Sequence, residues 1–133
     1  MSLSKEERNI MVQVELERAE RMTTEFAVYI ENQYWNTLVN RMYYAAFHAV
    51  TALLINKGLH AGTHQGVYAL LSQHFVKSGI VSQEEGRLFS RLATMREKGD
   101  YNCYIDATEE ELLPLIEPTK AFINHCRELI TQS

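Results

Sequence analysis

The sequence predicts an all-α protein, and two observations carry that prediction. Apolar residues recur three or four positions apart along several stretches, which is the period of a helix with one buried face. No segment alternates between apolar and polar residues for long enough to require a β-strand. With 133 residues, 46% hydrophobic and 23% charged, the chain has the composition of one globular domain that spans residues 1–133.

The stretch from Asn40 to Ile55 is the expected centre of this domain. It carries two neighbouring apolar faces, and a helix that is apolar nearly all round is buried on several sides. The first face consists of Leu38, Met42, Ala45, Ala49 and Leu53, and the second of Tyr43, Phe47, Val50 and Leu54. We therefore expect the central helix of a bundle. Four polar residues are set into it: Asn40, Arg41, Tyr44 and His48.

The first helix should follow Ser4, because Ser4 and Glu7 form a capping box, and should run to about Ile30. Its expected core positions are Ile10, Val14, Met22, Phe26 and Tyr29. After a polar break, the central helix should start between Tyr34 and Thr37. Gly58 suits its end, since glycine readily adopts the left-handed conformation that closes a helix.

Three more helices are expected in the second half of the chain. Thr63 can cap one that stops at Gly79 and buries Val67, Leu70, Leu71 and Phe75. A capping box at Ser82 opens the next, which Gly99 weakens, so that residues 100–106 should form a loop or a frayed turn. A third box at Thr108 opens the last helix. Pro114 and Pro118 predict either that this helix starts later or that it kinks.

The charge and the motifs exclude several function classes. A formal net charge of −4 gives no overall basic footprint for nucleic acid, so any RNA contact must be local or shared between subunits. There is no phosphate-binding glycine loop, and the two cysteines lack metal-ligand spacing. His60 and His64 are four apart but lie in a loop before a helix cap, so we expect no metal site. We also expect no cofactor, no membrane contact and a cytoplasmic location.

Two clusters remain as candidate sites. Arg41, Tyr44 and His48 share one helix face, either as a hydrogen-bonded seam that fixes the register of the bundle or, together with Asn40 and His64, as ligand-binding groups. Arg96, Asp100 and Tyr101 crowd around Gly99 at the end of the fourth helix. Arg96 and Asp100 either pair across one turn or orient a phosphate, because a guanidinium matches two phosphate oxygens.

These residues resemble a known family. The segment Asn40-Arg41-Met42-Tyr43-Tyr44-Ala45-Ala46-Phe47-His48 is similar to the second helix of bacterial and archaeal HEPN domains. Thr63-His64-Gln65-Gly66-Val67 and Phe75-Val76-Lys77-Ser78-Gly79 resemble the third helix, and Arg96 followed by Asp100-Tyr101 resembles a later motif. The resemblance covers nearly the whole chain in the expected order.

The resemblance implies an up-and-down bundle of four or five helices that usually forms a homodimer. Many relatives are encoded beside a minimal nucleotidyltransferase, and some such pairs act as toxin and antitoxin, the HEPN member being a metal-independent ribonuclease. That activity is associated with an arginine followed after four to six residues by a histidine. Here Tyr101, Asn102 and Cys103 occupy those positions, and the only literal match to the spacing is Arg41 with His48.

Two functions from different classes follow, and the sequence leaves open whether the chain is an enzyme. The first is a dimeric binding partner of a minimal nucleotidyltransferase, with a cleft near Arg96–Tyr101 that contacts a nucleotide or an RNA phosphate. The second is a ribonuclease toxin that uses Arg96 with Asp100 or Tyr101, helped by His48 or His64 if folding brings them near.

Overall fold

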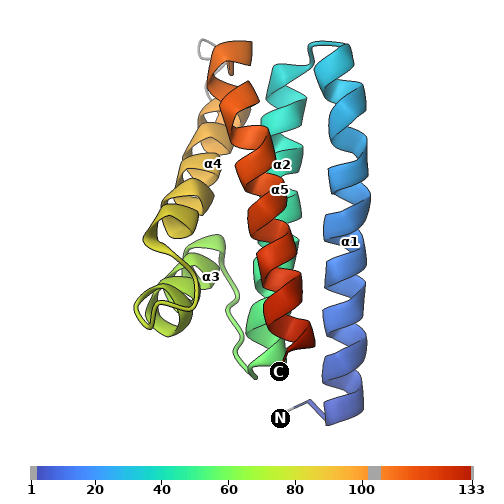
Figure 1. Ribbon diagram of the computed structural model, residues 1–133, viewed down its shortest axis with the longest axis vertical. Coiled ribbons are helices and arrows are strands. Elements are labelled where there is room, and N and C mark those ends of the chain that lie inside the picture. Colours follow the sequence, from blue (N-terminus) through green and yellow to red (C-terminus); the bar gives the residue numbers. More distant parts are fainter. Residues whose placement is uncertain (1–2, 102–105, 133) are drawn as a thin grey trace.

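The computed structural model describes residues 3–101 and 106–132, with only the backbone described at Tyr101. The chain folds into an up-and-down bundle of helices (Figure 1). The helices are α1 (Lys5–Glu31), α2 (Trp35–Asn56), α3 (His64–Leu71), a π-helical turn η1 (Ser72–Val76), α4 (Gln83–Tyr101) and α5 (Glu109–Thr131). Within the described ranges there is no strand, so the all-α prediction is confirmed.

Local capping fixes where the helices begin. The hydroxyls of Ser4, Thr63 and Thr108 each accept a hydrogen bond from a backbone amide of the first turn that follows. Ser82 does the same for α4, and Glu85 reaches back to the Ser82 amide at 2.9 Å. These bonds satisfy amides that have no partner within the helix, as predicted. Gly58 ends α2 with φ 76°, and the Leu59 amide donates to Leu54 at 2.9 Å.

The centre of the core is α2, as its apolar faces predict. It packs against α1, α3, α4 and α5. Every residue of its first predicted face is buried, and of the second only Phe47 is partly exposed. By length and composition alone α2 could cross a membrane, but 67% of that window is buried inside the bundle, as in the core helix of a globular protein.

The predicted core face of α1 is partly wrong. Ile10 is 64% exposed and Val14 39%, whereas Val12, Leu16 and Ala19 are buried together with the correctly predicted Phe26. The first half of α1 carries apolar residues on two faces, so its periodicity alone does not decide which face meets α2. The packing buries one face and leaves the other exposed to solvent.

The end of α4 and the start of α5 also differ from expectation. Helix α4 continues through Gly99 and Asp100 to Tyr101, so the expected loop does not begin at residue 100. Asn36 of α2 accepts from the Ala107 amide at 2.8 Å and donates to Asp106 at 2.9 Å, which ties the start of α5 to α2.

Helix α5 begins at Glu109, as its capping box predicts, and runs through both of its prolines. A later start is therefore ruled out. Proline has no backbone N–H, so Pro114 and Pro118 cannot donate to the carbonyls of Glu110 and Pro114, four residues before them. Because these residues are exposed, water can hydrogen-bond to both carbonyls.

Candidate functional site

Arg96 lies where α4 packs against α2, and its side chain is almost fully buried. Its Cζ atom stands 5.0 Å from the ring centroid of Tyr43 and 5.5 Å from that of Tyr44. Its Nη1 atom donates to Asp100 Oδ2 at 3.3 Å and, at the long limit, to the Tyr44 hydroxyl at 3.5 Å. The predicted pairing across one helical turn is therefore present, and two aromatic rings hold the guanidinium in place.

His64 is the first residue of α3, directly after the cap at Thr63. Its Nδ1 atom lies 2.7 Å from the hydroxyl of Tyr43. Its ring stacks on Phe47, with the centroids 4.5 Å apart and the planes 18° from parallel. The Tyr44 ring meets it edge-on at 5.9 Å. The Tyr43 ring also stacks on it at 5.7 Å, so one hydrogen bond and three ring contacts orient an imidazole that is still exposed to solvent.

Arg96 and His64 line one pocket of about 290 Å³ between α2, α3 and α4. We call it the Arg96 pocket. Its other lining residues are Tyr43, Gln65, Tyr68, Phe89, Ser90, Ala93, Thr94 and Glu97. The pocket therefore combines an arginine, an imidazole, hydroxyl groups and aromatic rings, which are groups that can contact the phosphate and the base of a nucleotide.

The local environment favours the neutral forms of two of these groups. Burial, and secondly the positive charge of Arg96, lower the pKa of His64 below its ordinary 6.5, although Glu97 works in the opposite direction. Burial raises the pKa of Tyr43 to about 12, despite the nearby charge of Arg96. At neutral pH the pocket therefore holds a neutral imidazole, which can accept a proton, beside a protonated phenol.

The polar side chains of α2 contact different neighbouring helices. Tyr44 meets Arg96 of α4, whereas His48 Nδ1 lies 2.6 Å from Glu15 Oε2 of α1. Both thus have the partners that a structural seam requires. The side chains of Asn40 and Arg41 are partly exposed and make no hydrogen bond or ion pair with any described residue. Of the predicted α2 group, only Tyr44 adjoins Arg96.

The remaining predicted residues fall into two groups. Asp100 contacts Arg96, with 37% of its side chain exposed. The side chain of Tyr101 and residues 102–105, including Cys103, lie outside the part of the chain that the structure describes. The other cysteine, Cys126, is fully buried in α5, and burial raises the pKa of its thiol.

Sequence reasoning missed the role of Tyr43 and the position of Glu97. Tyr43 lies on a predicted apolar face and its ring is buried, but its hydroxyl is the hydrogen-bond partner of His64. A buried tyrosine usually needs a hydrogen-bond partner for its hydroxyl, and that rule was the available signal. Glu97 follows Arg96 directly and lines the same pocket.

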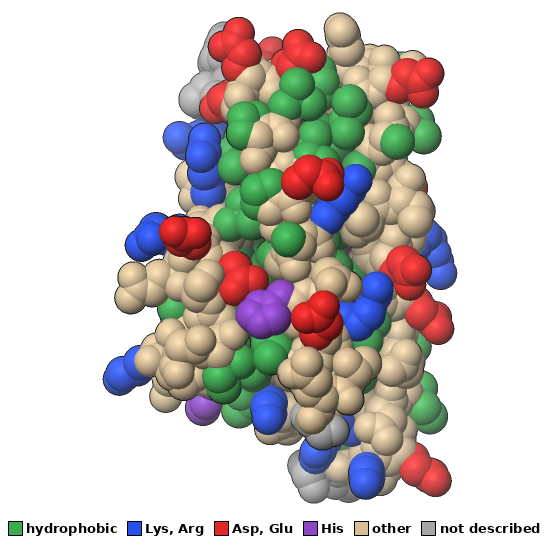
Figure 2. All heavy atoms as spheres, viewed as in Figure 1, with side chains coloured by type: hydrophobic (Ala, Val, Ile, Leu, Met, Phe, Trp, Pro, Cys, Tyr) green, Lys and Arg blue, Asp and Glu red, His purple; other side chains and the backbone are tan. Residues whose placement is uncertain are grey.

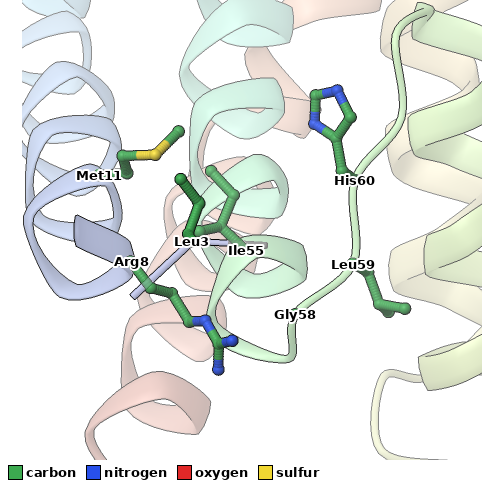
Figure 3. Close-up of a pocket in the computed structure, with 7 residues that line it drawn as sticks. All are labelled: Leu3, Arg8, Met11, Ile55, Gly58, Leu59 and His60. Atoms are coloured by element: carbon green, nitrogen blue, oxygen red, sulfur yellow. The ribbon is translucent and has the colours of Figure 1, made fainter. Parts of the chain in front are cut away.

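A second pocket, of about 420 Å³, lies near the chain's N-terminal segment and the end of α2. Figure 3 shows Arg8 and Met11 entering it from α1, Ile55 from α2 and His60 from the segment that follows Gly58. His60 therefore belongs to a different pocket from His64. The described residues contain no group of three or more potential metal ligands.

The surface carries charges of both signs without one dominant patch on the face shown in Figure 2. On that face, hydrophobic side chains gather over the upper half, where the first turns of α5 lie. Large apolar side chains exposed elsewhere include Ile10 and Val28 of α1. A nucleic-acid contact would thus depend on a local group such as Arg96 rather than on a general positive field.

Comparisons with known proteins agree on one family. A model of the HEPN domain matches residues 12–129. A Thermotoga maritima relative named "UPF0332 protein" is 34% identical over 113 residues, which cover 85% of this chain and 86% of the relative. A Methanocaldococcus jannaschii relative named "Putative toxin" is 30% identical over 121 residues, covering 91% and 90%. A second protein of that organism with the same kind of name is 24% identical over 86% of this chain and 78% of its own length.

Proposed function

The chain belongs to the HEPN family, and we propose that it binds a phosphate group of a nucleotide or of RNA in the Arg96 pocket. The observation that supports this proposal is the shared lining of one pocket by Arg96 and His64. The bidentate guanidinium suits phosphate oxygens, and an imidazole can donate or accept a hydrogen bond beside it. Tyr68, which is 37% exposed at the same pocket, offers a ring on which a base can stack.

Asp100 sets the strength of this binding. It already accepts a hydrogen bond from Arg96 at 3.3 Å, so a phosphate must compete with its carboxylate. Glu97 adds a second negative charge at the pocket. The proposal therefore predicts modest affinity for a single phosphate, with additional contacts to the sugar or the base needed for tight binding.

The same proposal includes the partners that the family suggests: a second copy of this chain and a minimal nucleotidyltransferase, in the cytoplasm. The apolar side chains that the isolated chain leaves exposed on α1, such as Ile10 and Val28, support a protein contact. Light scattering of the purified chain tests the homodimer. Co-expression with a nucleotidyltransferase encoded beside it tests the second partner, and two separate elution peaks would contradict that part.

Calorimetric titration with inorganic phosphate, with an adenine nucleotide and with a short single-stranded RNA tests phosphate binding. We expect Arg96→Gln to weaken binding of all three. Arg91→Gln is the matched control, since Arg91 is an exposed arginine on the same helix and does not line the pocket. Equal affinities for the wild type and for Arg96→Gln, with both proteins folded by circular dichroism, would refute the proposal.

A second candidate function is that of a ribonuclease toxin. One observation favours it: this chain lacks the histidine that follows the arginine in the family motif, but His64 lines the same pocket as Arg96. The names of the two archaeal relatives include the word toxin. Inducing the chain in a bacterial host and measuring growth and RNA integrity, against Arg96→Gln, tests this candidate. An uninhibited host with intact RNA would contradict it.

A further inference from the structure

The geometry points to His64 as the group that takes the proton from a ribose 2′-hydroxyl, with Tyr43 as the residue that positions it. This inference rests on the second candidate function and deepens it by assigning the proton acceptor. His64 is the first residue of α3 and Arg96 lies in α4, so the two are far apart in the sequence. The fold brings both side chains to one pocket.

The hydrogen bond to Tyr43 decides which nitrogen of His64 is left for a ligand. Nδ1 is engaged at 2.7 Å, whereas Nε2 makes no hydrogen bond to any described residue. A neutral imidazole has one N–H and one acceptor nitrogen. When Nδ1–H donates to the Tyr43 oxygen, Nε2 is the acceptor. The stack on Phe47 fixes the plane of the ring, so this nitrogen has a defined direction.

The reaction balances without any redox partner. The 2′-hydroxyl gives its proton to His64 Nε2, and its oxygen forms a bond to the adjacent phosphorus. The bond from phosphorus to the 5′-oxygen of the next nucleotide breaks, and that oxygen takes a proton from the imidazolium or from water. The products are a 2′,3′-cyclic phosphate and a free 5′-hydroxyl. Arg96 stabilises the negative charge that builds up on the phosphoryl oxygens.

The acidic groups of α4 are weaker candidates for this role. The Asp100 carboxylate already accepts a hydrogen bond from Arg96, so one of its oxygens is engaged. Glu97 lines the pocket but is exposed, and no hydrogen bond to a described residue orients its carboxylate. His64 alone among the three is held by both a hydrogen bond and a ring stack.

The first test is cleavage of a short mixed-sequence RNA, with the 2′-deoxy version of the same oligonucleotide as the probe of binding. His64→Asn is the informative variant, because its amide can still donate to Tyr43 but cannot carry a proton. We expect cleavage to fall by roughly a hundredfold or more, the range for loss of a general base, and to fall much further than the affinity for the deoxy probe, because the asparagine amide keeps a hydrogen-bonding group at this position. His74→Ala is the control, since His74 is exposed on η1 and outside the Arg96 pocket.

Each outcome separates this inference from the function on which it rests. If His64→Asn cleaves RNA as fast as the wild type, His64 is not the base and the ribonuclease stands. If the wild type binds the deoxy probe but leaves RNA intact, the inference fails together with the ribonuclease, and phosphate binding stands. If the wild type neither binds nor cleaves, the primary proposal fails as well.

The role of Tyr43 has a readout that does not depend on activity. Nitrogen-15 NMR of the imidazoles distinguishes the two neutral tautomers. We expect wild-type His64 to carry its proton on Nδ1 and Tyr43→Phe to mix the tautomers and to slow cleavage about tenfold. Tyr34→Phe, at an exposed tyrosine outside the pocket, should change neither. A wild-type His64 protonated on Nε2 would overturn the inference, because that nitrogen could not accept a proton.

The pH profile adds a second check. The titratable and charged groups described near His64 are Tyr43 and Tyr44 of α2, Tyr68 of α3, and Arg96 and Glu97 of α4. We expect cleavage to rise with pH to a plateau, with a midpoint below the ordinary histidine value of 6.5, and the residual activity of His64→Asn to lose that limb. An identical limb in the variant would assign the titration to another group and overturn the inference.

Discussion

The Cζ atom of Arg96 stands 5.0 Å from the ring centroid of Tyr43, and the hydroxyl of that same tyrosine lies 2.7 Å from His64. Tyr43 thus contacts both charged and titratable groups of the pocket: its ring lies under the Arg96 guanidinium, and its hydroxyl is hydrogen-bonded to the His64 imidazole. A displacement of Tyr43 would therefore disturb a contact of each group. Tyr44 also contacts both groups, so two neighbouring tyrosines of the central helix position Arg96 and His64 relative to each other.

The first prediction concerns competition for Arg96. Asp100→Asn removes the carboxylate that pairs with Arg96 at 3.3 Å, so inorganic phosphate should bind several-fold more tightly by calorimetry. Glu84→Gln removes the same charge from an exposed position in the first turn of α4 and controls for net charge. Weaker phosphate binding in Asp100→Asn alone would mean that Asp100 orients the ligand instead of competing with it.

The second prediction concerns acid stability. Burial works to raise the pKa of Glu15, but the hydrogen bond and the charge of His48, together with Arg18, outweigh it and leave that pKa below its ordinary 4.5. As the pH falls below 4.5, the unfolded chain takes up this proton first. The contribution of Glu15 to the free energy of unfolding is therefore present above pH 4.5 and lost as the pH drops through the lowered folded value.

Glu15→Gln tests this linkage by urea denaturation at several pH values. The variant should lose about 1.5 kcal/mol at neutral pH, because a hydrogen bond to a charged group is removed, and its stability should fall less steeply in acid. Glu17→Gln, at an exposed position on the same helix, should behave as the wild type does. A parallel acid limb in Glu15→Gln and the wild type would contradict the assignment.

The third prediction concerns the end of α2. Gly58 has φ 76°, a conformation that side chains with a Cβ atom disfavour, so Gly58→Ala should destabilise the protein by about 1 kcal/mol in urea denaturation. Gly62 lies in the same connection, without a positive φ and with open space around its Cα. Gly62→Ala should be neutral or slightly stabilising, and equal losses in the two variants would point to a general sensitivity of the loop.

The fourth prediction contrasts a buried and an exposed apolar residue. Leu53 of α2 is fully buried, so Leu53→Ala should lower the free energy of unfolding by about 2–5 kcal/mol. Ile10 of α1 is 64% exposed, so Ile10→Ala should change it by less than about 0.5 kcal/mol. A large loss in Ile10→Ala that depends on protein concentration would place that side chain in a subunit contact.

The sequence predicted what short-range chemistry controls. The capping residues Ser4 and Thr108 act within three positions of themselves, so their effect on the helix starts is visible in the sequence. Gly99 was expected to end α4 early, yet the helix continues because tertiary packing outweighs a weak local preference. The exposed positions of Ile10 and Val14 depend on which face of α1 meets α2, which spacing does not encode.

Of the candidate site, the contact within one helix could be predicted from the sequence, whereas the contacts between helices could not. The pairing of Arg96 with Asp100 spans one turn and followed from the sequence. The meeting of His64 with Arg96, and of His48 with Glu15, joins different helices, and it depends on how those helices rotate against each other. The available signal, that the hydroxyl of a buried tyrosine usually needs a hydrogen-bond partner, does not say which residue the partner of Tyr43 is.

The apolar character of α2 also matters while the protein is being made. This segment resembles a membrane-spanning helix in length and composition, so a bare α2 leaving the ribosome would be prone to aggregate or to enter a bilayer. Helix α1 precedes it in the chain and packs along it. The ribosome therefore makes α1 before α2, and α1 can cover one side of α2 before α4 and α5 are synthesised.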